Sequence, residues 1–405
     1  MKVLFLTNLL PYPLDNGGKI KTYTTLSALY AAGHDIDLLC FKEIKKDMID
    51  EEKELLKICR SIKQVYLPLT TANHKQYMMK VALKSLVSVL PFAIYKYQSS
   101  EMNNIISEYS RNEYDIIYLD HLPMCVYLKK VKSIWVGAKI ILDEHNCETL
   151  ISKRKATESN HIVKKVFFKY EAYKLEKFEA DSILNVNQTI VLSSEDYNFL
   201  KRLTKKDFDY SIIPIAVPDK GIKKCSSSNG KALNILFVGT LTWEPNNAGL
   251  IWFLKNVLPI IEKKALDYHL YIIGKNPSET VVKLCGAFGD KITITGYVNS
   301  LDDYYDICDC AIVPLFIGSG QRVKLIEAFS KGMPAISTKI GAEGLNYEDG
   351  KTIIIADDDT KFAEAIIAMT DHSYRRELQI NSRLVYEKYY SPQAVFGLIQ
   401  NAVDR

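Results

Sequence analysis

Residues 2–41 read KVLFLTNLLPYPLDNGGKIKTYTTLSALYAAGHDIDLLCF. The apolar run over 2–7 is typical of a buried strand, and the loop after it carries Gly17 and Gly18. Apolar residues at helical spacing predict a helix from about Lys19 to Ala32, which Gly33 ends before a second apolar run over 35–41. Strand, helix and strand in this order form a βαβ unit, which predicts a parallel sheet with right-handed crossovers.

The same pattern restarts at residues 233–239, LNILFVG. Further apolar runs predict strands over 64–67, 116–119, 139–142, 189–192, 268–273, 292–295, 310–314 and 335–338. We therefore expect two Rossmann-like, doubly wound domains, over 1–217 and 231–390, joined by a polar linker over 218–230. A last helix over 392–404, which Ser391 caps, is expected to pack back on the first domain. Two such sheets predict ligand binding in an interdomain cleft.

The composition is that of an ordinary globular protein. Hydrophobic residues make up 47% and charged residues 25% of the 405 positions, which argues against a disordered chain and a coiled coil. The eight cysteines are scattered, so we expect free thiols in a reducing compartment. No apolar run is long enough for a membrane span or a signal peptide, and we expect a cytoplasmic protein.

The segment over 314–334, PLFIGSGQRVKLIEAFSKGMP, carries the strongest chemical signal. Gly318 and Gly320 allow a close approach of the backbone to a ligand, and a helix is predicted to start near Gln321. Arg322 and Lys324 would oppose the helix dipole unless an anion lies between them and the helix, and a diphosphate is such an anion. Alternatively, the glycines form only a turn and a lysine pairs with Glu327.

These residues resemble the donor signature of the retaining GT-B glycosyltransferases often called family 4. The resemblance rests on Gly318-x-Gly-x-Arg-x-Lys-x-x-Glu327 with Gly332-x-Pro334, and on the segments 237–240, 295–298 and 340–344. It extends over nearly the whole chain, since residues 11–18 resemble the N-terminal glycine loop of the family and Ile213-Pro214 the strand before its linker. It implies transfer of a sugar from a nucleotide-diphosphate sugar with retention of the anomeric configuration, and Arg322, Lys324 and the helix dipole could stabilise the leaving phosphate without a metal.

The resemblance also implies residue roles. Arg322 and Lys324 would neutralise the leaving diphosphate, and Glu327 would hold the ribose. Donor contacts are expected from Gly17, Gly18, Gly239, Thr240, Gly318, Ser319 and Gly320, and base contacts from the backbone near Tyr297 and Val298. Ser319 stands where the family usually carries a glutamate. The loop 241–247 lacks the arginine and lysine that many members carry, so we infer that Arg322 and Lys324 replace them.

Polar residues follow two strands of the first domain. Asp120 and His121 follow the run 116–119, and His145 follows the run 139–142, where cleft chemistry is expected in open parallel sheets. The resemblance implies that an acid or histidine here orients the sugar or the acceptor, so we predict Asp120 and His121 as catalytic and Asp120 and His145 as acceptor-binding residues. Structural roles for the histidines, and a simple loop at Gly17-Gly18, remain alternatives.

Two basic, apolar segments suggest a lipid partner. Residues 76–90 predict an apolar helix with Lys80 and Lys84, and residues 153–177 predict a second, basic helix. Both could lie on the anionic inner face of the plasma membrane and admit a lipid-linked acceptor, or else be a core helix and a solvated face. The resemblance to this family also implies a role in bacterial surface polysaccharide biosynthesis.

Other functions remain possible on the same sequence. A UDP-sugar epimerase or a phosphorylase of this fold, and a non-catalytic nucleotide-sugar-binding subunit, are the alternatives to a glycosyltransferase. We expect no nucleic acid partner, since no nucleic-acid motif accompanies the net charge of +4, and no metal or other cofactor, since no carboxylate pair is spaced to hold a divalent ion.

Overall fold

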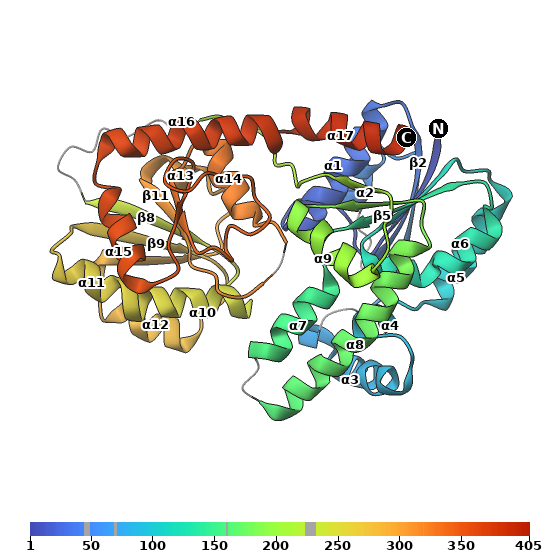
Figure 1. The fold of residues 1–405 in the computed structure, drawn as a ribbon, viewed down its shortest axis with the longest axis horizontal. Coiled ribbons are helices and arrows are strands. Elements are labelled where there is room, and N and C mark those ends of the chain that lie inside the picture. Colours follow the sequence, from blue (N-terminus) through green and yellow to red (C-terminus); the bar gives the residue numbers. More distant parts are fainter. Residues whose placement is uncertain (44–48, 69–70, 159–160, 223–231, 319) are drawn as a thin grey trace. The chain divides into compact units, whose positions relative to one another are not determined.

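The structure is a computed structural model that describes residues 1–43, 49–68, 71–158, 161–222, 232–318 and 320–405 (Figure 1). The chain divides into two compact units. The first unit contains Met1–Ile215 together with Val395–Arg405, and the second contains Ala216–Ala394. The predicted linker 218–230 lies outside the described residues from 223 onward, as does Ser319.

The first unit is built on a seven-stranded sheet in the order β3-β2-β1-β4-β5-β6-β7, in which every pair of neighbours is parallel. Its strands are β1 (Lys2–Thr7), β2 (Asp35–Lys42), β3 (Ser61–Tyr66), β4 (Ile116–Asp120), β5 (Lys139–Glu144), β6 (Gln188–Val191) and β7 (Tyr210–Ile212). Central strands such as β1 are buried on both faces, as expected for a sheet that helices cover on both sides.

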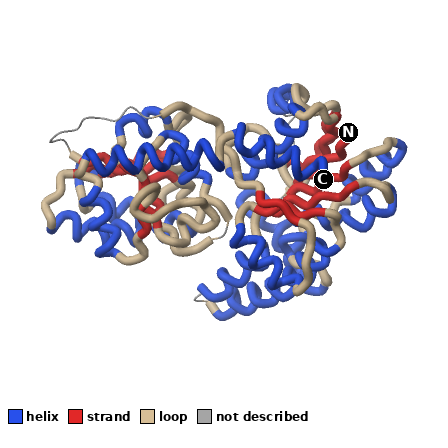
Figure 2. The backbone as a smooth tube through the Cα atoms, turned by 45° about the horizontal axis from the view of Figure 1, so that its top comes forward, coloured by secondary structure: helices blue, strands red, loops and turns tan. Residues whose placement is uncertain are grey.

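Helices cover this sheet (Figure 2). They are α1 (Gly17–Ala31), α2 (Ile49–Leu55), α3 (Thr71–Val87), α4 (Phe92–Tyr95), α5 (Ser100–Glu108), α6 (Leu128–Ile134), α7 (Glu148–Glu158), α8 (Ile162–Leu184), α9 (Ser194–Thr204) and the end of α17 (Pro392–Asp404), with the 3-10 turns η1 (Tyr109–Arg111) and η2 (Leu122–Tyr127). Asn16 caps α1, because its side chain accepts a hydrogen bond from the backbone N–H of Lys19.

The second unit is built on a six-stranded parallel sheet in the order β10-β9-β8-β11-β12-β13. Its strands are β8 (Leu233–Val238), β9 (Tyr268–Ile273), β10 (Ile292–Gly296), β11 (Cys310–Val313), β12 (Ala335–Ser337) and β13 (Ile354–Ile355). Separate apolar clusters cover its two faces: Ile235 and Phe237 belong to one cluster, and Leu236, between them, belongs to the other.

The helices of the second unit lie on both faces of its sheet (Figure 1). They are α10 (Glu244–Trp252), the π-helical segment η3 (Phe253–Val257), α11 (Leu258–Lys263), α12 (Glu279–Gly286), α13 (Asp302–Ile307), α14 (Val323–Lys331), α15 (Asp359–Ala368) and α16 (His372–Tyr389), with the 3-10 turn η4 (Gly289–Lys291). This architecture confirms the expected α/β class with two doubly wound parallel sheets.

Three details differ from the predictions. The single basic helix expected over 153–177 is wrong, because α7 ends at Glu158 and α8 begins at Ile162. The helix expected near Gln321 begins at Val323. The two edge strands β7 and β13 were not separately predicted, because runs of three and two residues carry no periodic signal.

The cysteines follow the prediction wherever the structure describes them. Seven of them are free and buried, and Cys225 lies outside the described residues. In the described part of the chain, no helix combines the length and the apolar character that crossing a membrane requires.

Candidate functional site

Each sheet has one point at which the strand order reverses. This point lies between β1 and β4 in the first unit and between β8 and β11 in the second. In open parallel sheets, ligands bind at the carboxyl ends of the strands beside such a point. The residues predicted from the sequence follow these four strands: Gly17 and Gly18 come after β1, Asp120 ends β4, Gly239 and Thr240 come after β8, and Arg322 and Lys324 come after β11.

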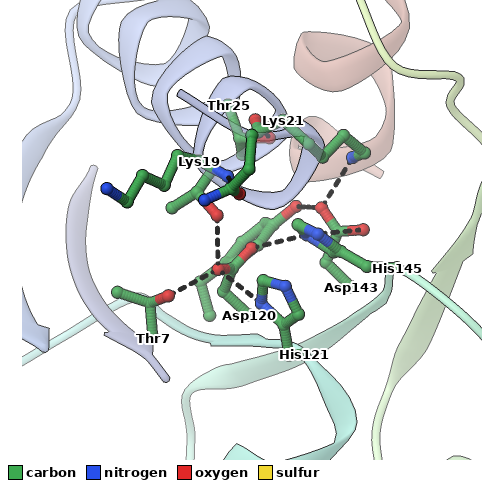
Figure 3. A network of polar contacts seen from close by, with 11 residues as sticks. Thr7, Lys19, Lys21, Thr25, Asp120, His121, Asp143 and His145 are labelled. Carbon is green, nitrogen blue, oxygen red and sulfur yellow. Dashed lines mark hydrogen bonds and ion pairs between the residues drawn. The ribbon is translucent and has the colours of Figure 1, made fainter. Parts of the chain in front are cut away.

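The Asp120 carboxylate is the centre of the polar group in the first unit (Figure 3). Its Oδ2 accepts hydrogen bonds from the hydroxyls of Thr7 and Thr22, both at 2.7 Å, and its Oδ1 lies 2.9 Å from Nε2 of His145. The side chain is fully buried. Burial opposes its ionisation, yet the charges and hydrogen bonds of His145 and His121 hold the pKa of this carboxyl well below its usual range.

His121 is the member of this group that reaches the surface. Its Nδ1 lies 3.0 Å from Oδ2 of Asp120, and 13% of its side chain is exposed. A Cβ atom built on Gly18 would lie 3.5 Å from its Nε2, so this nitrogen faces the glycine loop. The backbone φ of His121 is 74°, a strained value for a residue other than glycine. Such strain persists only where the surroundings fix it, and functional sites often store it.

The ring of His145 packs against the ring of His121. The two imidazole rings lie 3.6 Å apart between centroids, and His145 is buried. Burial, and then the neighbouring His121, lower the pKa of His145, against the opposing charges of Asp120 and Asp143. Among the described residues, Asp120, His121 and His145 form a group whose ligand atoms lie within 4.8 Å of one another, close enough to hold a metal ion.

A buried ion pair supports the glycine loop. Lys21, on α1, donates a hydrogen bond from Nζ to Oδ2 of Asp143 at 2.8 Å (Figure 3). Tyr118 donates its hydroxyl to the same oxygen at 2.6 Å. Both partners of the pair are buried. The bond fixes α1, which carries Gly17 and Gly18 at its start, against the end of β5. Sequence reasoning missed Lys21, and the only signal was a lysine among the apolar positions of a helix.

Glu144, which precedes His145 in the chain, and Glu179 form a pair of buried carboxyl groups. Burial and the neighbouring Glu179 raise the pKa of Glu144 well above its usual range, and burial raises the pKa of Glu179 to about 7. Glu179 accepts hydrogen bonds from the backbone N–H groups of Glu148 and Thr149 at 2.8 and 3.3 Å. No ordinary donor among the described residues reaches the oxygens of Glu144. Because both pKa values are raised, a proton shared by the two carboxyl groups would supply the missing donor.

A cavity of about 410 Å³ opens beside the glycine loop of the first unit. Its wall contains the side chains of Asn8, Tyr12, Asn16, Lys19, Phe41 and Tyr97. Aromatic rings together with amide groups suit a sugar, because the rings cover its apolar face and the amides pair with its hydroxyls.

In the second unit, Arg322 directly precedes α14, and its guanidinium lies beside Gly318. A Cβ atom on Gly318 would lie 2.4 Å from Nη2 of Arg322, and the φ of Gly318 is 137°. The backbone conformation therefore favours glycine here, and a side chain at this position would displace the guanidinium of Arg322. Arg322 is buried, and Gly320 also has a positive φ, of 77°. The structure thus brings Gly318 and Arg322 together at the positive end of a helix, as the sequence predicted.

Lys324, in the first turn of α14, reaches the loop after β8. Its Nζ donates a hydrogen bond to Oδ1 of Asn246 at 2.8 Å and would lie 3.0 Å from a Cβ atom on Gly239. Asn246 in turn donates to the backbone carbonyl of Thr240 at 3.0 Å. Burial, and then the nearby charge of Arg322, lower the pKa of Lys324 to about 7. Sequence reasoning missed Asn246, since an asparagine in the first turn of a helix such as α10 carries no distinctive signal.

Glu327 lies one turn further along α14. Among the described residues, none donates a hydrogen bond to its carboxylate, and burial raises its pKa, against the opposing charges of Lys220 and Lys324. No lysine forms an ion pair with it in the described part of the chain, contrary to the alternative considered from the sequence. An unpaired, largely desolvated carboxylate is poised to accept hydrogen bonds from a ligand.

Tyr297 and Val298 follow β10 at the same edge of the second sheet. The backbone N–H of Gly239 donates to Ile273, and that of Gly274 donates to Gly296, so the ends of β8, β9 and β10 lie in one row. Tyr297 is 63% exposed, and the ammonium group of Lys275 lies 4.0 Å from the centroid of its ring. Val298 packs against the apolar cluster that contains Ala328 of α14, and Tyr297 and Val298 share this edge of the sheet with Gly239.

Comparisons with known proteins agree with these observations. Residues 232–372 match the family model of glycosyl transferases group 1. An uncharacterised 44.6 kDa protein of the cps region of Klebsiella pneumoniae is 28% identical over 98% of both chains. Sucrose-phosphate synthase of Thermosynechococcus elongatus is similar in structure, with a TM-score of 0.71, 15% identity and 99% and 98% of the two chains covered. HepE of Anabaena, solved with UDP and glucose, has a TM-score of 0.67 and 11% identity, with 100% and 99% covered.

The structural neighbours identify the fold. Both share the two parallel-sheet α/β units, and the chain has the GT-B fold. Together with the family match over 232–372, this fold supports a GT-B glycosyltransferase.

Proposed function

We propose that this protein is a retaining, family 4 glycosyltransferase that takes a sugar from a nucleotide-diphosphate sugar. The observation that carries the proposal is the start of α14. There, two cations, Arg322 and Lys324, oppose the helix dipole, and the amine of Lys324 has its pKa lowered to about 7. A diphosphate group at this place would accept hydrogen bonds from both side chains and remove the electrostatic penalty.

The second unit would hold the donor. In this proposal Arg322 and Lys324 neutralise the leaving diphosphate, which lowers the barrier to cleavage of the glycosidic bond, and they do so without a metal ion. Glu327 accepts hydrogen bonds from the ribose. The backbone at Gly239, Thr240, Gly318 and Gly320 allows the close approach of the phosphates, and the backbone near Tyr297 and Val298 holds the base.

The first unit would act on the sugar and the acceptor. Because Asp120 and His145 are buried, we propose that they position His121 and do not themselves touch a ligand. His121 then presents Nε2 to a sugar hydroxyl beside Gly17 and Gly18. The cavity beside the glycine loop accommodates a sugar ring of a glycan or lipid-linked acceptor. We place the reaction in bacterial surface polysaccharide biosynthesis, at the cytoplasmic face of the plasma membrane.

Incubation with UDP-, GDP- and ADP-sugars tests the proposal. One of them should be hydrolysed slowly without an acceptor, and NMR of the first sugar product should show the anomeric configuration of the donor. A product of inverted configuration would contradict the retaining mechanism. An epimerised nucleotide sugar in place of free sugar would contradict glycosyl transfer altogether.

Substitution of His121 tests the role of the first unit. His121→Ala should lower kcat by about 100-fold or more, because it removes the group that orients the reacting sugar. The affinity for nucleoside diphosphate should stay unchanged, since the donor phosphates bind the second unit. Asp120→Asn should also lower kcat, because the ring of His121 loses its charged partner. An unchanged kcat in both variants would remove these residues from the site.

A further inference from the structure

Two helices of the first unit expose rows of large apolar side chains. Those of α3 are Met79, Leu83, Leu86 and Val87, with Val89 just after its end, and those of α8 are Ile162, Val163, Val166, Tyr170 and Tyr173. The exposed fraction reaches 92% for Val87 and 82% for Val163. Single apolar side chains on a surface are ordinary, but a contiguous group of them marks an interaction site.

The spacing places each row on one face of its helix. On α3, Met79, Leu83 and Val87 are four residues apart, and on α8, Ile162, Val166 and Tyr170 are four residues apart. Residues at this spacing lie one above another along a helix. Each helix therefore presents an apolar stripe to its surroundings.

Direct contacts join the two helices. The hydroxyl of Tyr170 donates a hydrogen bond to the backbone carbonyl of Leu86 at 3.1 Å. Lys174 donates from Nζ to the carbonyls of Ser85 and Leu90, at 2.8 and 3.1 Å. Figure 1 shows α3 and α8 together at one end of the first unit, below its sheet. The two stripes therefore belong to one surface, the α3–α8 surface, made of residues 79–89 and 162–173.

This surface carries charge of one sign. Its exposed basic side chains are Lys80 and Lys84 on α3 and Lys164, Lys165 and Lys169 on α8, and the exposed Lys75 and Lys177 lie just outside it on the same helices. The sequence has no aspartate or glutamate over 71–87 or over 162–170. The acids that follow on α8 are engaged: Glu171 is buried beside Lys174, and Glu176 pairs with Lys153 at 2.9 Å. Apolar side chains flanked by lysines are typical of a helix that lies in a membrane interface.

We propose that the α3–α8 surface docks on a bilayer that contains anionic phospholipids. The lysines would lie among the head groups, and the exposed valines and leucines would enter the boundary between head groups and acyl chains. A second copy of the chain fits this surface poorly, because a two-fold contact would bring the lysines of each copy against those of the other. The docking depends on this surface alone and does not rest on the proposed transfer reaction.

Vesicle flotation tests the proposal. The full chain should float with vesicles of phosphatidylcholine and phosphatidylglycerol at low salt, and much less with pure phosphatidylcholine or at high salt. The double variant Val87→Asp/Val163→Asp should lose binding, since charged groups replace the inserting side chains. Each of the single variants Lys80→Gln, Lys84→Gln, Lys165→Gln and Lys169→Gln should lower the partition coefficient of the protein between vesicle and buffer by about fivefold.

Matched controls lie on other surfaces of the first unit. Val136 is 87% exposed between α6 and β5, and Lys129 is exposed on α6, so Val136→Asp and Lys129→Gln should bind vesicles like the wild type. The circular dichroism spectrum and the affinity for nucleoside diphosphate should stay unchanged in all variants, which separates this test from that of the transferase site. Absence of wild-type flotation, or an equal loss in the controls, would overturn the proposal. A dimer in light scattering that only the α3–α8 variants abolish would assign the surface to a second copy.

Discussion

Lys324 is the residue whose protonation is coupled most directly to binding of the proposed diphosphate ligand. Burial and Arg322 lower its pKa to about 7, so in the free protein it is largely neutral at about pH 8. A bound diphosphate would restore the charge, and binding at this pH should therefore take up close to one proton.

Calorimetry in two buffers of different ionisation enthalpy measures this uptake. The apparent enthalpy of UDP or GDP binding should differ between Tris and HEPES at about pH 8, and the difference should shrink at about pH 6, where the amine is already charged. Lys324→Arg, which keeps its charge at every such pH, should take up no proton. Equal enthalpies in the two buffers for the wild type would contradict a depressed pKa at Lys324.

The carboxyl pair of Glu144 and Glu179 predicts a pH dependence of stability. Both pKa values are raised in the folded chain, that of Glu179 to about 7, so the folded state holds more protons than the unfolded state above about pH 4. This contribution to stability is complete below the pKa values of the unfolded chain and is lost as the pH rises through 7. Each retained proton changes the free energy of unfolding by about 1.4 kcal/mol per pH unit.

Urea unfolding at about pH 6 and pH 8 tests the pair. Glu144→Gln removes one titrating group and keeps a hydrogen-bond donor for Glu179, so the variant should lose less free energy of unfolding between the two pH values than the wild type. Glu108→Gln, on the exposed face of α5, should behave like the wild type. An identical pH dependence in Glu144→Gln would show that the pair holds no extra proton.

At the residue scale, the sequence predicts groups whose signal is local. Gly318 and Arg322 stand four residues apart, and the structure places them in contact. Asn246 and Lys21 were missed because their partners, Lys324 and Asp143, lie 78 and 122 residues away. A polar partner that comes near only through the tertiary fold cannot be predicted from the spacing of residues along the sequence.

At the scale of elements, strands were predicted more accurately than helix ends. The run 268–273 is β9 without any change of bounds, because a buried parallel strand is an uninterrupted apolar run between polar loops. The break between α7 and α8 was missed, because lysines and aromatic residues continue on both sides of it. Ser152 on α7 bonds the carbonyl of Phe168 on α8 at 3.1 Å, and sequence periodicity cannot show such a hairpin.

The helix α17 joins the last residues of the chain to the first unit. Ile399 is buried on it, and Lys139 of β5 donates a hydrogen bond from Nζ to the carbonyl of Ala402 at 2.8 Å. Ile399→Ala should lower the free energy of unfolding by about 2–5 kcal/mol, because it leaves a cavity in a packed face. The neighbouring Leu398 is 41% exposed, so Leu398→Ala should change stability by much less. Equal effects in chemical denaturation would show that α17 does not pack through this face.

At the scale of the whole molecule, the repeated strand pattern is what made the fold predictable. Two βαβ patterns, one from Lys2 and one from Leu233, correspond to two parallel sheets whose order reverses between β1 and β4 and between β8 and β11. The rule that ligands bind beside such points selects the same loops as the motifs do. The side chains around those loops determine which nucleotide base, which donor sugar and which acceptor are bound, and no pattern in a single sequence specifies these three.

The central claim is that the start of α14 binds the diphosphate of a sugar donor, and titration calorimetry with UDP and GDP tests it most directly. Arg322→Ala and Glu327→Ala should each weaken the preferred nucleotide by about 1.5–3 kcal/mol, because each removes a charge-assisted contact. Arg376→Ala and Glu364→Ala, on exposed faces of α16 and α15, should bind like the wild type. Wild-type affinity in Arg322→Ala and Glu327→Ala would contradict the account.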